Sequence, residues 1–236
     1  MREMEDWRKI GACCGVGFVI LFIVGFALQG DPPMTNDSAA QIRDYFADKG
    51  DTYIIGDFFF ALGFTFFFLP FLSVLTSHLA GAEGTPPVWS WVVFGIGVAM
   101  IGVGGALSGV QGAIAYREGA GLSDEVLTAL VSVSYYSNIL VWAFGTGLLA
   151  LAASMIMLRR RVFWPWLGWL GMAYAPLAVV SFFALLGDEP DEGLGILTWI
   201  AFLVFGIWVL IVSAALWRAS EPASRMQTAG GMADAG

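Results

Sequence analysis

The apolar residues of this chain are gathered into six long blocks, which short polar segments separate. A helix that crosses a hydrocarbon layer about 30 Å thick needs about 20 apolar residues, and its backbone satisfies its own hydrogen bonds there. The pattern therefore predicts an all-α fold, a polytopic membrane helix bundle of about six transmembrane helices within residues 1–218. We expect the spans at residues 10–29, 52–79, 88–116, 126–158, 163–186 and 194–217.

A short amphipathic helix is predicted in the loop after the first span. Ser38 and Gln41 have the spacing of a capping box, and Gly50 is a natural place for a helix to stop. Between them the apolar positions fall on one face and the charged positions on the other. We expect a helix over about residues 38–49 on the outer rim, where it could rest on the lipid interface, cover the mouth of the bundle or meet a partner protein.

Composition agrees with a membrane protein, and charge orients it. Of the 236 residues, 58% are hydrophobic and 13% are charged, about half of the charged share of a soluble domain. Placing both termini in the cytoplasm puts eight of the 11 Lys and Arg residues inside, with the run Arg159–Arg161 among them. Residues 219–236, rich in Ala, Gly and Ser, predict a disordered cytoplasmic tail. The loops expected outside are acidic, and the last of them carries Asp188, Glu189, Asp191 and Glu192.

Small residues on the third expected span indicate a face that another helix could approach closely. Four glycines fall on one stripe of that helix: Gly102, Gly105, Gly109 and Gly112. Two helix backbones can pack tightly along such a stripe. Packing inside one bundle is the simpler interpretation, and a seam between copies in a homo-oligomer is the alternative.

Asp57 is the one carboxylate inside an expected span, about five residues from its outer end. A carboxylate within a bilayer is costly, so it is a candidate for function. Polar residues of the third and fourth spans lie at the same level: Ser108, Gln111, Tyr135 and Asn138. If these spans converge, Asp57 would lie at the bottom of an outward-facing polar pocket as the counter-ion of a cation, an amine or a lipid headgroup. Hydrogen bonding between helices, worth about 0.6 kcal/mol per pair, is the simpler interpretation.

Other chemistry has little support in the sequence. The phenylalanine runs 58–60 and 66–68 surround the second span, which is typical of a lipid-facing helix and could also line a groove for a pigment or quinone. His78 is the sole histidine, no cluster of metal-ligating residues is present, and no nucleotide-binding or nucleophile motif occurs. We therefore expect no cofactor, no metal, no nucleic-acid partner and no enzymatic activity.

Two stretches resemble a known group of proteins. They are Ile42-Arg43-Asp44-Tyr45-Phe46-Ala47-Asp48 leading into Ile54-Ile55-Gly56-Asp57, and Trp164-Pro165-Trp166-Leu167-Gly168-Trp169-Leu170-Gly171. In these the chain is similar to a broad group of uncharacterised six-helix bacterial integral membrane proteins, grouped as a domain of unknown function. The resemblance implies a multi-pass protein of the bacterial inner membrane and assigns no role to any residue.

Two functions follow as expectations. The first is a non-enzymatic membrane protein of accessory or structural type that binds partner proteins or lipids through its helix faces and outer rim. The alternative is a small permease or binding protein for a cationic or lipidic ligand, held in the pocket around Asp57.

Overall fold

The computed structural model describes residues 2–117, 119–183 and 195–219. Outside the described residues lie Glu118, residues 184–194 and residues 220–236. Residues 184–194 include the acidic Asp188, Glu189, Asp191 and Glu192, and residues 220–236 belong to the expected tail. The helices are α1 (Arg2–Gln29), α2 (Ala39–Leu62), the π-helix η1 (Gly63–Phe68), α3 (Leu69–Glu83), α4 (Val88–Tyr116), α5 (Asp124–Leu140), the π-helix η2 (Val141–Thr146), α6 (Gly147–Arg160), α7 (Pro165–Ser181) and α8 (Gly195–Ala219).

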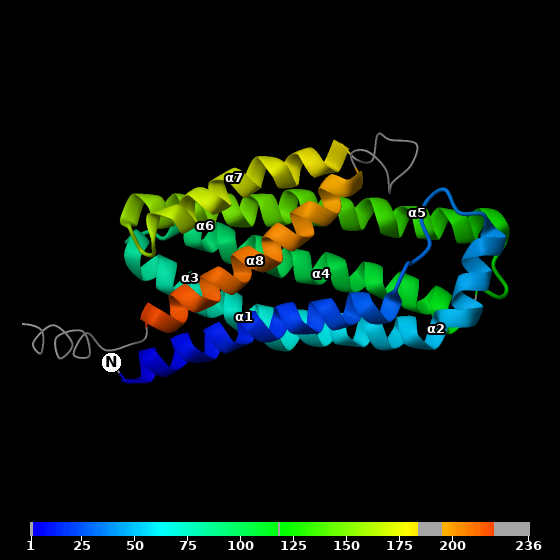
Figure 1. The fold of residues 1–236 in the computed structure, drawn as a ribbon, viewed down its shortest axis with the longest axis horizontal. Helices are drawn as coiled ribbons and strands as arrows, with labels where there is room; N and C mark the ends of the chain where they lie inside the picture. The colour runs from blue at the N-terminus through cyan, green and yellow to red at the C-terminus, as the bar shows by residue number, and fades with distance from the viewer. Residues whose placement is uncertain (1, 118, 184–194, 220–236) are drawn as a thin grey trace, which may run out of the picture.

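The described chain is all-α, as predicted, and its long apolar helices run side by side in one bundle (Figure 1). Two of the long helices each consist of an α-helix, a short π-helix and a second α-helix in unbroken order, α2–η1–α3 and α5–η2–α6. Five helical stretches are long and apolar enough to cross a membrane: Glu5–Gln29, Ala39–Glu83, Val88–Tyr116, Asp124–Arg160 and Ile196–Ala219. The remaining helix, α7, has 17 residues and packs against α6 and α8. The fold is therefore compatible with the predicted membrane helix bundle.

The π-helix η1 lies directly before a proline. Pro70 has no N–H and its ring would collide with the carbonyl of the residue four positions earlier in a regular α-helix. The wider turn of η1 precedes this position, and the Leu69 N–H donates to the Phe64 carbonyl five residues back. The rod thereby passes the proline without ending, so a single helix of 45 residues forms from residue 39 to residue 83.

Both described ends of the chain lie at the same end of the bundle. The Arg8 guanidinium donates to the Ala219 carbonyl at 2.7 Å, and Figure 1 shows α1 beginning beside the end of α8. The end of α6, with its arginines, and the α3–α4 turn are at this end too, because Arg160 donates to the Glu83 carbonyl at 2.8 Å. Five of the six exposed tryptophans among the described residues belong to helix ends of this side, as expected for a membrane interface: Trp7, Trp91, Trp166, Trp169 and Trp217. The sixth, Trp199, lies near the start of α8 at the other end. That the end with both described chain ends faces the cytoplasm stays a prediction.

The α3–α4 turn is fixed by one carboxylate. Glu83 accepts hydrogen bonds from the Trp89 and Ser90 backbone N–H groups, each at 2.9 Å, and from the Ser90 hydroxyl at 2.7 Å. These N–H groups are among those that a helix start leaves without a partner, and a negative charge is favourable there. Burial alone would raise the pKa of the Glu83 carboxyl, but these bonds and nearby Arg160 hold it below its ordinary value.

The predicted short helix over residues 38–49 is only partly correct. The helix begins as expected, because Ser38 and Gln41 form both bonds of the capping box. The expectation that it ends at Gly50 is wrong, since α2 continues to Leu62. Gly50 serves close packing instead: a Cβ built on it would lie 3.1 Å from the Ala115 carbonyl oxygen of α4.

The expectation that the α4 glycine stripe packs against another helix of the bundle is also wrong. A Cβ built on Gly102, Gly105 or Gly109 would meet no atom within 4 Å, and one on Gly112 would meet only the Asp57 carboxylate, at 3.6 Å. The helix packs through a different face, where a Cβ on Gly97 would overlap the fully buried Leu72 side chain of α3. The spacing of glycines showed a smooth helix face but not which face the neighbours cover.

Candidate ligand cavity

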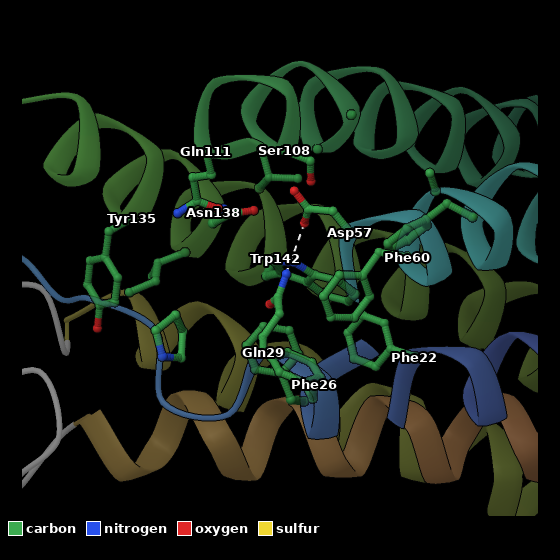
Figure 2. A pocket seen from close by; sticks show the side chains of 18 of the residues that line it. Phe22, Phe26, Gln29, Asp57, Phe60, Ser108, Gln111, Tyr135, Asn138 and Trp142 are labelled. Atoms are coloured by element: carbon green, nitrogen blue, oxygen red, sulfur yellow. Dashed lines mark hydrogen bonds between the residues drawn. The ribbon is translucent and has the colours of Figure 1, made fainter. Parts of the chain in front are cut away.

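A cavity of about 290 Å³ lies inside the bundle, toward the end opposite the described chain ends. Its walls come from α1, α2–η1, α4, α5–η2 and α8, and residues of the α1–α2 connection close it on one side (Figure 2). Small-molecule sites typically measure about 300–1,000 Å³, so this one is at the small end of that range. The cavity contacts both buried clusters of the protein, through Met100 of the larger and Tyr53 of the smaller.

All five residues predicted as ligand-binding line this cavity. Asp57 comes from α2, Ser108 and Gln111 from α4, and Tyr135 and Asn138 from α5. The three helices converge because α4 lies between α2 and α5 and contacts both. The structure therefore brings together on one wall the polar residues that the sequence placed at one level, while their role in binding stays a prediction.

A hydrogen-bond network holds the polar end of the cavity. The Gln29 side-chain amide donates to Asp57 Oδ1 at 2.9 Å, and the Tyr53 hydroxyl donates to Gln111 Oε1 at 2.7 Å. Gln29 is the last residue of α1 and is only 5% exposed. Its carbonyl, which a helix end leaves without an intrahelical partner, accepts from the Tyr45 hydroxyl at 2.6 Å. This second bond fixes the end of α1 and so aims the Gln29 amide at Asp57.

Tyr45, on the first turns of α2, keeps its proton throughout the physiological range. Burial, with smaller contributions from Asp31 and Asp57, raises the pKa of its hydroxyl to about 12. The hydroxyl therefore remains the donor that the Gln29 carbonyl needs. A close approach of α1 and α2 makes this arrangement possible, because a Cβ on Gly56 would lie 2.8 Å from Gln29 Cγ.

Asp57 has no basic partner within the described part of the chain. The one ion pair found there joins Arg43 to Asp124 at 2.7 Å, and both of these side chains are partly exposed. The side chain of Asp57 is itself half-buried. A carboxylate removed from water is costly unless a cation or enough hydrogen bonds compensate it. The polar end of the cavity thus presents a carboxylate whose charge no residue of the described chain neutralises.

Aromatic rings form a large part of the remaining cavity wall. The ring centroids of Trp142 and Phe202 are 4.6 Å apart, those of Phe22 and Trp142 are 5.2 Å apart, and those of Phe22 and Phe60 are 5.3 Å apart. These rings come from α1, α2, η1, η2 and α8, and the full set is Phe22, Phe26, Phe60, Phe64, Trp142, Trp199 and Phe202, hereafter the aromatic wall. Of the phenylalanine runs, Phe58 and Phe66 are exposed while Phe60 lines the cavity, and a pigment or quinone as the occupant stays a prediction.

The α4 wall owes its shape to missing side chains. Gly104 and Gly105 line the cavity, and a Cβ on either would meet no atom within 4 Å. These two positions therefore leave open the space that larger residues would fill. A Cβ on Gly102, which does not line the cavity, would also meet no atom within 4 Å. A substitution at Gly102 is therefore a matched control for one at Gly104 or Gly105.

Sequence reasoning missed Gln29, Tyr53 and most of the aromatic wall. Gln29 is a polar residue at the outer end of the first span, at the level of Asp57, and this signal could have found it. The aromatic residues of α1, η2 and α8 look like ordinary lipid-facing positions, and only tertiary packing assigns them to one cavity.

Other candidate chemistry lies elsewhere. His78 is half-buried and stacks on Phe163 with ring centroids 5.1 Å apart. Within the described ranges no group of three or more His, Cys, Asp or Glu residues is placed to hold a metal ion. Comparisons of the chain with protein-family models, with curated proteins and with solved structures found no match.

Proposed function

We propose that the protein is a multi-pass membrane protein that binds, or moves across the membrane, an amphipathic small molecule in the cavity between α1, α2, α4, α5 and α8. One observation carries the proposal: a half-buried carboxylate and a wall of aromatic rings share one cavity of about 290 Å³. A lipid-like molecule would place its polar group at Asp57 and its apolar part along the aromatic wall. The resemblance described above favours the bacterial inner membrane as its location.

Binding suits these residues better than catalysis. Nucleophilic catalysis needs a hydroxyl, thiol or amine activated by a neighbouring base. Around Asp57 the described polar partners are amides and phenols, and their hydrogen bonds hold one another in place. Such groups orient a ligand without supplying an activated nucleophile. We therefore propose a non-enzymatic role.

A substitution that fills the cavity tests the proposal. Gly104→Leu adds a side chain to the α4 wall where no protein atom obstructs it, and Gly102→Leu adds the same side chain to the same helix outside the cavity. We expect native mass spectrometry of the wild-type protein, extracted gently from its membrane, to show one bound small molecule. Gly104→Leu should lose it and Gly102→Leu should keep it. Equal ligand content in all three proteins, or none in the wild type, would refute the proposal.

An accessory role is the second candidate. The observation that favours it is the uncovered face of α4, where Gly102 and Gly109 have open space above them and Val98 and Val103 are more than 40% exposed. A partner membrane protein, a second copy or lipid could cover this face. The mass of the complex extracted in a mild detergent distinguishes the cases, because a stoichiometric partner or an integer multiple of 25.4 kDa would favour the accessory role.

A further inference from the structure

We infer that the ligand is a monovalent organic cation with an apolar chain, whose ammonium group binds the Asp57 carboxylate. The inference rests on the proposed function and adds the charge of the ligand to it. Among the described residues that line the cavity, Asp57 is the one with a carboxyl group, and none is a Lys, Arg or His. The charge of the site is therefore set by a single carboxylate.

The geometry of Asp57 leaves one oxygen for a ligand. Oδ1 accepts from the Gln29 amide at 2.9 Å. Oδ2 faces Gly112 of α4, where a Cβ would lie 3.6 Å away, so the oxygen faces a position without a side chain. Figure 2 shows the carboxylate between Gln29 on one side and the α4 residues Ser108 and Gln111 on the other. Asp57, Ser108 and Gln111 all line the cavity, so a cationic group bound there would lie beside this carboxylate.

The neighbouring polar groups disfavour other headgroups. The Tyr53 hydroxyl gives its proton to Gln111 Oε1, so the donors left around Asp57 for an anion are uncharged amide and hydroxyl groups. An anionic headgroup would meet Asp57 with no cation to offset the repulsion, because like charges at short range destabilise each other in a medium of low dielectric. A neutral headgroup could donate a hydrogen bond to the carboxylate, as Gln29 does, but would supply no opposite charge. A cation supplies both the contact and the opposite charge, so it fits this site best.

The aromatic residues next to Asp57 suit both parts of such a ligand. Phe22, Phe26 and Phe60 lie beside Gln29 and Asp57 in Figure 2, with Trp142 behind them. The faces of aromatic rings attract ammonium groups within about 6 Å and also bury an alkyl chain. One carboxylate neutralises one positive charge, so a monocation fits and a dication would keep an unpaired charge in an apolar cavity.

Three probes with the same twelve-carbon chain test the charge directly. They are dodecyltrimethylammonium, dodecanol and dodecanoate, and binding of the tritiated cation is measured to the full chain in nanodiscs of phosphatidylcholine. We expect the cation to bind at least tenfold tighter than either competitor, which corresponds to about 1.4 kcal/mol. Asp57→Asn should weaken the cation at least tenfold and leave dodecanol unchanged. Asp57→Glu, which keeps the charge, should retain most of the binding of the cation.

The outcomes separate this inference from the proposed function. If dodecanol or dodecanoate binds as tightly as the cation, or if Asp57→Asn leaves the cation unaffected, the inference on charge is wrong. The proposed function survives that result if Gly104→Leu still abolishes binding and Gly102→Leu does not. If none of the probes binds, both fail. Thermal unfolding of each variant in the same nanodiscs shows whether lost binding reflects lost folding, and Asp57→Glu repeats the test if Asp57→Asn does not fold.

Discussion

The same substitution at two glycines of α4 should change stability in opposite directions. Gly105 faces open space in the cavity wall, and a Cβ there meets no atom within 4 Å. At Gly97 a Cβ would overlap Leu72 Cδ2 and would lie 3.1 Å from Cδ1 and 3.2 Å from Cγ. Leu72 is fully buried in a close-packed core, so its side chain has little space into which to move.

The magnitudes follow from helix propensity and from packing. Gly→Ala inside a helix stabilises by about 0.5–1 kcal/mol because the unfolded chain loses freedom. Gly105→Ala should therefore raise the free energy of unfolding by about that amount. Gly97→Ala gains the same term but overpacks the α3–α4 interface, which costs about 1–3 kcal/mol, so a net loss of up to about 2.5 kcal/mol is expected.

Equilibrium unfolding in mixtures of mild detergent and dodecyl sulfate, followed by circular dichroism, measures both free energies against the wild type. The proteins should unfold in the order Gly97→Ala, wild type, Gly105→Ala as the dodecyl sulfate fraction rises. Two changes of equal sign would contradict the packing described for α4, and a stabilised Gly97→Ala in particular would mean that α3 does not pack against this face.

Three further predictions concern the two ends of the bundle and the cavity. Glu83→Ala should lower the free energy of unfolding by about 1–2 kcal/mol because it removes the acceptor of a helix start. Since the pKa of Glu83 is depressed in the folded protein, its contribution to stability is present above the unfolded pKa and is lost as the pH falls through the folded pKa. If Glu83→Ala left the acid side of the pH–stability curve unchanged, this contribution would be excluded. Arg43→Ala should remove an ion pair worth less than about 1 kcal/mol, because Asp124 is 75% exposed, and a hydrogen bond to the Leu122 carbonyl. The part of the cost due to the ion pair should shrink in 1 M salt, and a cost that salt does not change would show that the pair contributes nothing. Gln29→Ala should lower the free energy of unfolding by about 1–3 kcal/mol, because Asp57 loses its hydrogen-bond donor. The same substitution should cost less when it is made in the Asp57→Asn variant. Equal costs in the wild type and in Asp57→Asn would show that the Gln29–Asp57 bond contributes nothing.

The sequence predicted the helices well because an apolar block of membrane length leaves the backbone few alternatives. The third expected span, 88–116, has the bounds of α4. Asp57 and its four polar neighbours were placed at one level by counting residues along straight helices, and that count holds because helix rise is constant. Five polar residues of the cavity were therefore predictable, whereas Gln29 and Tyr53 of the same polar end were missed.

Features that depend on which helix faces meet could not be predicted in the same way. Gly50 looked like a helix stop, but its lack of a side chain serves the approach of α4, and propensity cannot distinguish these uses. The glycine stripe of α4 resembled a packing seam, yet the face that packs contains Gly97, with Gly105 left to the cavity. The aromatic wall joins residues of α1 and α8 that are more than 170 positions apart, and only the tertiary arrangement reveals it.

The most direct test of the central claim is a cryo-electron microscopy map of the protein extracted gently from its own membrane. The proposal predicts one elongated molecule in the cavity, with its polar end within hydrogen-bond distance of Asp57 and its apolar end beside Trp142. A cavity closed by the aromatic rings packing onto one another, or one containing ordered water alone, would contradict it.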